Sequence, residues 1–268
     1  MVLTVGSGPF GEAASGEFNF DRPDNTVIYW EDWPKRFRIE LGGKTIADSR
    51  AVKALHETGH LMRLYIPRED VDMRALGRSG TSTHCPHKGD ATYYSFGADD
   101  GAVKDVAWSY EDPLDRAPPM KDYLSFDLDK VDAWYMEDDE GYAHPRNPYH
   151  RVDVHQSSRH VAARLDGVVV AETQKPAILF ETGLPPRYYF APDEVQKDQL
   201  QRSETLTHCP YKGPARHWHV ATGSERVEDA AWSLSDPIGD SASIEDWISF
   251  YPDKVAIEVD GEVLRDGQ

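Results

Sequence analysis

The chain has 268 residues, 39% of them hydrophobic and 11% aromatic, so it is long enough to bury one large core or two smaller ones. Its formal net charge of −18 repels phosphate backbones and anionic lipids, which excludes nucleic acid and membranes as expected partners. No apolar run reaches the roughly eighteen residues of a membrane helix, and the opening residues do not resemble a signal peptide, so a cytoplasmic protein is expected.

Residues 1–26 are predicted to form a flexible N-terminal arm. They contain "GSGPFG" (6–11), which matches the glycine pattern of dinucleotide-binding loops. Such a loop requires a helix immediately afterwards, so that the helix N-terminus meets the pyrophosphate. Gly16 and Pro23 interrupt the residues that follow, and therefore no nucleotide site is expected here.

The next part of the chain has the alternation of β-strands. "FRIELGGKTIADS" (37–49) alternates apolar and polar residues on both sides of Gly42 and Gly43, which predicts a hairpin. One short helix is predicted after Pro67, over "REDVDMRAL" (68–76). Further short strands are predicted in the runs "MRLYIP" (62–67), "ATYYSF" (91–96), "VKDVAWSY" (103–110) and "VDAWYME" (131–137).

The second half of the chain repeats the first. Shifted by 124 residues (207 − 83), "THCPHKG" (83–89) meets "THCPYKG" (207–213), and "DVAWSYEDP" (105–113) meets "DAAWSLSDP" (229–237). The hairpin recurs around Asp166 and Gly167, and the short helix recurs over 193–200. Two tandem, mainly β domains of about six to eight strands each, related by pseudo-twofold symmetry, are therefore predicted. The predicted boundaries are an arm at 1–26, a first repeat domain at 27–145, a linker at 146–158 and a second repeat domain at 159–268.

"HETGH" (56–60) matches the H-E-x-x-H pattern of zinc proteases, in which a helix holds two histidines one turn apart on the metal. Its counterpart in the second half contains Pro176, Pro185 and Pro186, which are incompatible with a helix. Because the repeat has no gaps, both segments should follow one backbone path. We therefore predict a strand and a turn here, and no protease site.

The order of the E-T-G, R-x-Y, T-x-C-P-x-K-G, A-W-S and F-x-x-D-K-V blocks resembles a bacterial family known as domain of unknown function 427, also labelled nucleotidyltransferase-like. The resemblance covers nearly all of both copies. It implies a small domain of the β-tent class, whose relatives include zinc-ribbon-bearing and small-molecule-binding proteins. The chain lacks the paired C-x-x-C knuckles of those relatives, so neither a structural zinc nor another cofactor is expected.

The T-H-C-P-x-K-G block allows three interpretations. As a reactive site, Cys85 would be activated by His84 and Lys88, because a nearby cation favours the thiolate, and Cys209 would be activated likewise by His208 and Lys212. As a metal site it fails in one copy, since Tyr211 replaces His87, and no metal is expected. As a simple turn it would bury an inert cysteine beside proline and glycine. The first and third interpretations stay open.

Aromatic residues and arginines recur with the same spacing. Large aromatics with a polar tip suit a ligand pocket, and an arginine among them suits a carboxylate or phosphate. In the other interpretation they are core residues, and the arginines pair with Glu57 and Glu181. "HWH" (217–219), where the first copy has Tyr93 and Ser95, is interpreted as a half-exposed strand. The candidate ligand-binding residues are Arg63, Tyr65, Tyr94, Trp108, Tyr123 and Glu57 in the first copy, and Arg187, Tyr189, Trp218, Trp232, Trp247 and Glu181 in the second.

The function expected from these features is binding of a small molecule, either a small anion or an aromatic ring with an acidic group. Whether an enzyme uses the Cys/His/Lys/Arg pocket is left open, and the exchange of His87 for Tyr211 suggests that one copy is active and the other a scaffold. A non-catalytic structural or protein-interaction module is the alternative. A nucleotide-handling transferase rests on the family label alone, and the sequence makes no prediction of oligomeric state.

Overall fold

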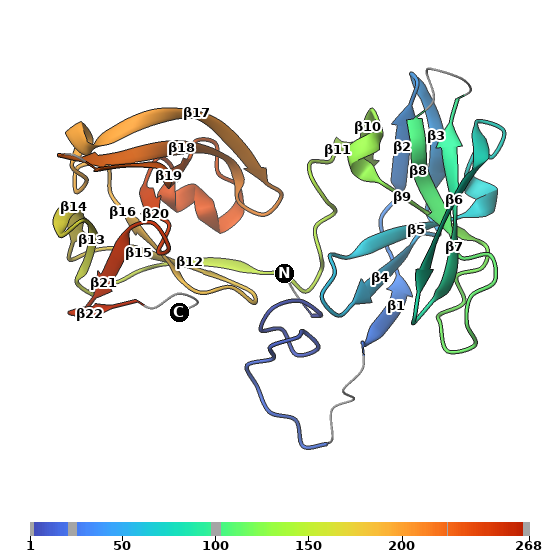
Figure 1. The fold of residues 1–268 in the computed structure, drawn as a ribbon, viewed down its shortest axis with the longest axis horizontal. Helices are drawn as coiled ribbons and strands as arrows, with labels where there is room; N and C mark the ends of the chain where they lie inside the picture. The colour runs from blue at the N-terminus through green and yellow to red at the C-terminus, as the bar shows by residue number, and fades with distance from the viewer. Residues whose placement is uncertain (1–2, 21–25, 98–102, 224, 265–268) are drawn as a thin grey trace. The chain divides into compact units, whose positions relative to one another are not determined.

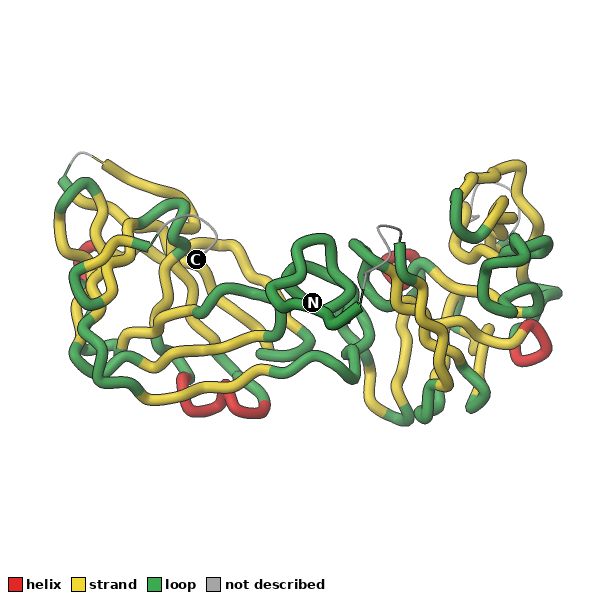
Figure 2. The backbone as a smooth tube through the Cα atoms, turned by 90° about the horizontal axis from the view of Figure 1, so that it is seen from below, coloured by secondary structure: helices red, strands yellow, loops and turns green. Residues whose placement is uncertain are grey.

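The computed structural model describes residues 3–20, 26–97, 103–223 and 225–264 (Figure 1). The chain divides into two compact units, residues 1–147 and residues 148–268. Strands and loops make up most of the described backbone, and its few helical segments are 3₁₀ turns of three to six residues (Figure 2). No helix among the described residues is long and apolar enough to cross a membrane.

The first unit consists of a long sheet and a short sheet, both with antiparallel pairing. The long sheet has seven strands in the order β1 (Ile28–Asp32), β4 (Lys53–Glu57), β5 (Arg63–Pro67), β9 (Tyr123–Phe126), β8 (Val103–Ser109), β7 (Gly89–Phe96) and β6 (Leu76–Cys85). The short sheet has the order β11 (Asp139–Glu140), β10 (Ala133–Met136), β2 (Phe37–Leu41) and β3 (Lys44–Ser49).

The second unit has the same two sheets, which confirms the tandem repeat. Its long sheet has the order β12 (Val152–Gln156), β15 (Ala177–Glu181), β16 (Arg187–Phe190), β20 (Ile248–Phe250), β19 (Glu225–Leu234), β18 (Gly213–Thr222) and β17 (Leu200–Cys209). Its short sheet has the order β14 (Val168–Thr173), β13 (Val161–Leu165), β21 (Ala256–Val259) and β22 (Glu262–Val263). The predicted mainly β class is therefore confirmed for both units.

The two predicted short helices form, but they are much shorter than the predicted ranges. Only single 3₁₀ turns form, at Arg68–Asp70 (η1) and Lys197–Gln199 (η4). Val71 and Val195 lie inside the predicted helices, but each makes a β-bridge to the short sheet, with Ala47 and Ala171 respectively, and this pairing competes with helix formation. The other short turns are Leu128–Lys130 (η3) and Gly239–Ile244 (η5).

The "HETGH" segment is a strand followed by a turn, as predicted. Strand β4 ends at Glu57, and its counterpart β15 ends at Glu181, 124 residues later (181 − 57). The first histidine of the segment, His56, is buried and bonds through Nε2 to Glu31 Oε1 at 2.8 Å. Among the described residues, no group of three His, Cys, Asp or Glu side chains is placed to hold a metal ion.

Each unit has an apolar cluster on both faces of its long sheet. Between the two sheets of the first unit, Ile39 from the short sheet packs with Ile66 and Leu124 from the long sheet. The opposite face of the long sheet carries a second cluster around Leu55 and Tyr65. Successive residues of a strand point to opposite faces, which is why β5 sends Leu64 and Ile66 to the first cluster and Tyr65 to the second. We call the second surface the aromatic face.

Two segments outside the predicted domains are more ordered than expected. The predicted linker, 146–158, contains strand β12, which pairs with β15 from Val152 to Gln156. The N-terminal arm is not free either, because Thr4 is buried and its carbonyl oxygen accepts a hydrogen bond from Gly59 N at 2.8 Å. The arm therefore packs on the turn that follows β4.

Candidate functional site

The aromatic face of the first unit brings together seven of the residues that the sequence singled out. Arg63 and Tyr65 lie on β5, and the Arg63 guanidinium carbon lies 5.8 Å from the ring centroid of Trp108 on β8. The same face includes Glu57, Cys85, Lys88 and Tyr123. Its equivalent in the second unit is formed by Glu181, Arg187, Tyr189, Cys209, Lys212, Trp232 and Trp247.

A buried ion pair anchors this face in the first unit. Lys88 Nζ donates a hydrogen bond to Glu57 Oε2, and both side chains are only 8% exposed. Lys88 lies in the turn between β6 and β7, which are four to five strands away from β4 in the sheet order. In a flat sheet that separation would be about 20 Å, well beyond the reach of the two side chains. The long sheet must therefore curl around the aromatic face, and the ion pair links its two ends.

The second unit keeps this ion pair and adds a histidine. Lys212 Nζ donates to Glu181 Oε2, and His150 Nε2 donates to Glu181 Oε1 at 3.0 Å. The ring of Tyr211 lies 3.8 Å from that of His150. Burial alone raises the pKa of Glu181, but the hydrogen bond from His150 and the charge of Lys212 outweigh it and lower the pKa to about 2. Glu181 is therefore a permanently ionised acceptor, unsuited to donate a proton.

A tyrosine–tryptophan hydrogen bond recurs in both units. Trp108 Nε1 donates to Tyr65 Oη at 3.4 Å, and Trp232 Nε1 donates to Tyr189 Oη at 3.1 Å. Burial raises the pKa of both phenols, so they remain protonated at neutral pH. The hydrogen bond fixes the orientation of each indole. Trp108 stays half-buried, with part of its ring accessible at the surface.

The structure does not bring the predicted histidines to the cysteines. His84 precedes Cys85 on β6, so its side chain points to the other side of the strand, where it is 67% exposed and bonds to Asp90 Oδ1 at 2.6 Å. His208 has the same position before Cys209 and is also exposed. The two cysteines are free, half-buried thiols. The lysine of each block binds a glutamate of the aromatic face.

Two of the predicted aromatic residues lie on the opposite face of the long sheet. Tyr94 belongs to the core between the sheets, and its hydroxyl donates to Glu111 and accepts from Arg68 Nη2 at 2.9 Å. Its counterpart Trp218 packs against the equivalent core and donates to Ser233 Oγ at 3.2 Å. The residue just before each of them, Tyr93 or His217, does point to the aromatic face. At these two positions the sequence analysis therefore singled out a strand that reaches the aromatic face, but a residue that points to the opposite face.

Those neighbouring positions, Tyr93 and His217, are among the residues that the sequence missed. His217 is 5% exposed, so the "HWH" strand is more buried there than predicted. Tyr93 packs against the first aromatic cluster. His150 was also missed, because the repeat gave no signal for it. Other residues of this face that were not singled out are Trp30, Tyr110 and Tyr251.

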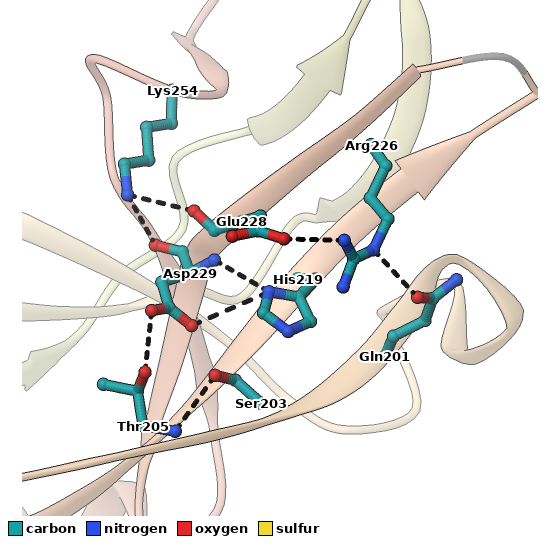
Figure 3. Close-up of polar contacts among 8 residues, drawn as sticks. All are labelled: Gln201, Ser203, Thr205, His219, Arg226, Glu228, Asp229 and Lys254. Carbon is teal, nitrogen blue, oxygen red and sulfur yellow. Dashed lines mark hydrogen bonds and ion pairs between the residues drawn. The ribbon is translucent and has the colours of Figure 1, made fainter.

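A second polar cluster recurs at a β-bulge (Figure 3). In the second unit Asp229 has φ 47°, its N–H donates to His219 Nδ1 at 3.1 Å, and its carboxylate accepts from Thr205 Oγ1 at 2.8 Å. Lys254 Nζ donates to the carbonyl oxygens of Glu228 and Asp229. The first unit has the same arrangement with Asp105, Ser95, Thr81 and Lys130. The cluster fixes the bulge and is structural.

Comparison with known families gives one result. Residues 29–137 and 153–261 each match the model of the family described as Domain of unknown function (DUF427). These two stretches cover most of both units. Among curated proteins, no relative matches the chain.

Proposed function

Because the chain belongs, with two tandem copies, to this family of unknown function, whose description assigns no activity, we propose its function from the site: each repeat binds a small aromatic acid on its aromatic face. The observation that carries the proposal is the arginine beside a tryptophan in the first repeat, at two positions whose residue types recur in the second. Arg63 is exposed and its guanidinium lies against the half-buried ring of Trp108. Arg187 and Trp232 are their counterparts.

The charges on this face leave the arginines for a ligand. The carboxylates expected to neutralise them, Glu57 and Glu181, bind Lys88 and Lys212 instead. An arginine held beside an aromatic ring offers a planar fork of donors for a carboxylate. The indole next to it offers an apolar surface for a ring. A small molecule with both groups, such as an aromatic carboxylate, fits these two features together.

We propose binding and no reaction. A cysteine nucleophile requires an adjacent base or cation that lowers the pKa of the thiol. The neighbouring histidine points away from each cysteine, and the neighbouring lysine binds a glutamate. In the second repeat that glutamate, Glu181, has a pKa lowered to about 2 by His150 and Lys212 and is a poor general acid. The aromatic face therefore offers recognition groups without an assembled catalytic set.

Titration of the full chain with benzoate tests the proposal. We expect saturable binding, measured by calorimetry and by quenching of tryptophan fluorescence. The matched variants Arg63→Gln and Arg187→Gln should each weaken the binding of one repeat by about tenfold, since an ionic hydrogen bond of about 1.5 kcal/mol or more is lost. Benzyl alcohol, which has the ring without the acid, should not distinguish the variants from the wild-type chain.

The control variant is Arg74→Gln, because Arg74 has a side chain 91% exposed, pairs with Asp72 and lies outside the aromatic face. It should bind benzoate as the wild-type chain does. If benzoate binds equally well to the chain that carries both Arg63→Gln and Arg187→Gln, the site is wrong. If no aromatic acid binds to the wild-type chain, the structural or protein-interaction module becomes the better explanation of the fold.

A further inference from the structure

One of the differences between the two repeats changes the polar groups of the aromatic face. In the first repeat the hydroxyl of Tyr93 shares a hydrogen bond with Thr83 Oγ1 at 3.0 Å. In the second repeat His217 takes the place of Tyr93, and its Nε2 shares a hydrogen bond with Thr207 Oγ1, also at 3.0 Å. The threonine partner is thus the same in both repeats. A tyrosine has one polar atom, whereas a histidine has two, so the exchange adds one nitrogen to the second repeat.

That added nitrogen, His217 Nδ1, is buried without a hydrogen-bond partner among the described residues. The side chain as a whole is 5% exposed. Burial lowers the pKa of His217, so the ring is neutral and has one N–H. An orphaned buried N–H is rarer than an orphaned acceptor. Nε2 therefore has the proton and donates to Thr207, and Nδ1 presents a lone pair.

The surroundings of His217 suit an aromatic ligand. Tyr251 lies nearly parallel to its ring, at 13° and with centroids 6.2 Å apart, and Trp232 lies 4.3 Å from Tyr251. Arg187 is close enough that its charge opposes the rise in the pKa of Tyr251 that burial causes. A second unpartnered polar atom, Ser249 Oγ, belongs to the residue opposite Trp232 in the sheet register. Aromatic rings, the charge of Arg187 and a hydrogen-bond acceptor without a partner therefore occur in the same part of the second unit.

We infer that the second repeat selects aromatic acids that also have a hydrogen-bond donor on the ring, such as a phenolic hydroxyl, and that His217 is the residue that determines this specificity. The donor of the ligand would bond to Nδ1 while its carboxylate meets Arg187. The first repeat, in which Thr83 satisfies the hydroxyl of Tyr93, accepts the plain acid without this preference. The inference rests on the proposed function and assigns a ligand class to one of its two sites.

The experiment compares benzoate with 2-, 3- and 4-hydroxybenzoate on the full chain with Arg63→Gln, so that the second repeat dominates the signal. We expect at least one hydroxybenzoate to bind about five- to tenfold more tightly than benzoate, which corresponds to one added hydrogen bond of about 1 to 1.4 kcal/mol. His217→Tyr, which installs the residue of the first repeat, should reduce this preference to less than about twofold. The control variant Arg74→Gln, outside the aromatic face, should leave both affinities unchanged.

A spectroscopic measurement on the wild-type chain makes the test independent of how the variant folds. With ¹⁵N-labelled histidine, the Nδ1 signal of His217 should shift when the preferred hydroxybenzoate is added and stay in place with benzoate. If the preference persists in His217→Tyr, or if no hydroxybenzoate is preferred at all, the inference is overturned. The proposed function still holds in that case, provided that benzoate binds. If none of the four acids binds, both are overturned.

Discussion

At the scale of single residues, one lysine–glutamate ion pair recurs in both units, but with different burial and different partners. Glu57 and Lys88 are nearly inaccessible to solvent. Glu181 has a second partner in His150, and Lys212 is more accessible, with 19% of its side chain exposed. Removal of one member of a buried pair leaves an uncompensated charge, which costs more than the pair contributes. The two units should therefore respond differently to the same substitution.

We expect Lys88→Met to destabilise the first unit by about 3–5 kcal/mol, because Glu57 is left buried without its cationic partner. Lys212→Met should lower the free energy of unfolding of the second unit clearly less, because His150 still donates a hydrogen bond to Glu181. Urea unfolding of each variant, followed by circular dichroism, measures the difference. The double variant Glu57→Leu with Lys88→Met should recover much of the loss. Equal costs for the two single variants would mean that His150 does not stabilise Glu181.

The same residues show what the sequence could and could not predict about the site. Repetition identified Glu57 and Lys88 as members of one site, but the spacing placed Lys88 beside Cys85, whereas the curled sheet brings it to Glu57. That contact joins segments 31 residues apart (88 − 57), and no local pattern encodes it. His150 could not be found, because the first copy has Thr26 at that position.

At the scale of elements, the alternation of apolar and polar residues and the gapless repeat together predicted most strands. The prediction of helix length failed where pairing with a neighbouring strand competes with a local preference for helix. The turns around Gly42 and Asp166 have the positive φ that the hairpin pattern requires. The short helices were predicted from composition after a proline, yet the bridges at Val71 and Val195 draw these residues into the sheet. The bulges at Asp105 and Asp229 were also missed, because a single residue at positive φ does not disturb the apolar pattern.

Asp229 offers a test of the bulge. Its φ of 47° disfavours residues with a Cβ, although aspartate and asparagine tolerate this region better than others. Asp229→Ala should lower the thermal midpoint of unfolding, because it keeps the strain and loses the hydrogen bond from Thr205. Asp229→Asn should lower it less, because it keeps an acceptor and the backbone preference. If the two variants melt at one temperature, the side chain does not stabilise the bulge.

At the scale of the whole molecule, each unit has a complete set of the elements that a folded domain needs. Each has one seven-stranded and one four-stranded sheet in the same order. Each also has an apolar cluster between its sheets and another on the aromatic face. A domain with its own core can in principle fold alone. The repeat in the sequence therefore corresponds to two folding units, with the division after Asn147.

Separate expression of residues 1–147 and 148–268 tests this division. We expect both fragments to give dispersed amide spectra and cooperative urea unfolding, because the ion pair and both apolar clusters of each unit lie within its own fragment. Lys212→Met should destabilise the isolated second fragment as much as it destabilises that unit in the full chain, since His150, Glu181 and Lys212 all lie within it. A fragment that stays unfolded, or a cost that differs between fragment and chain, would show that the units depend on each other for stability.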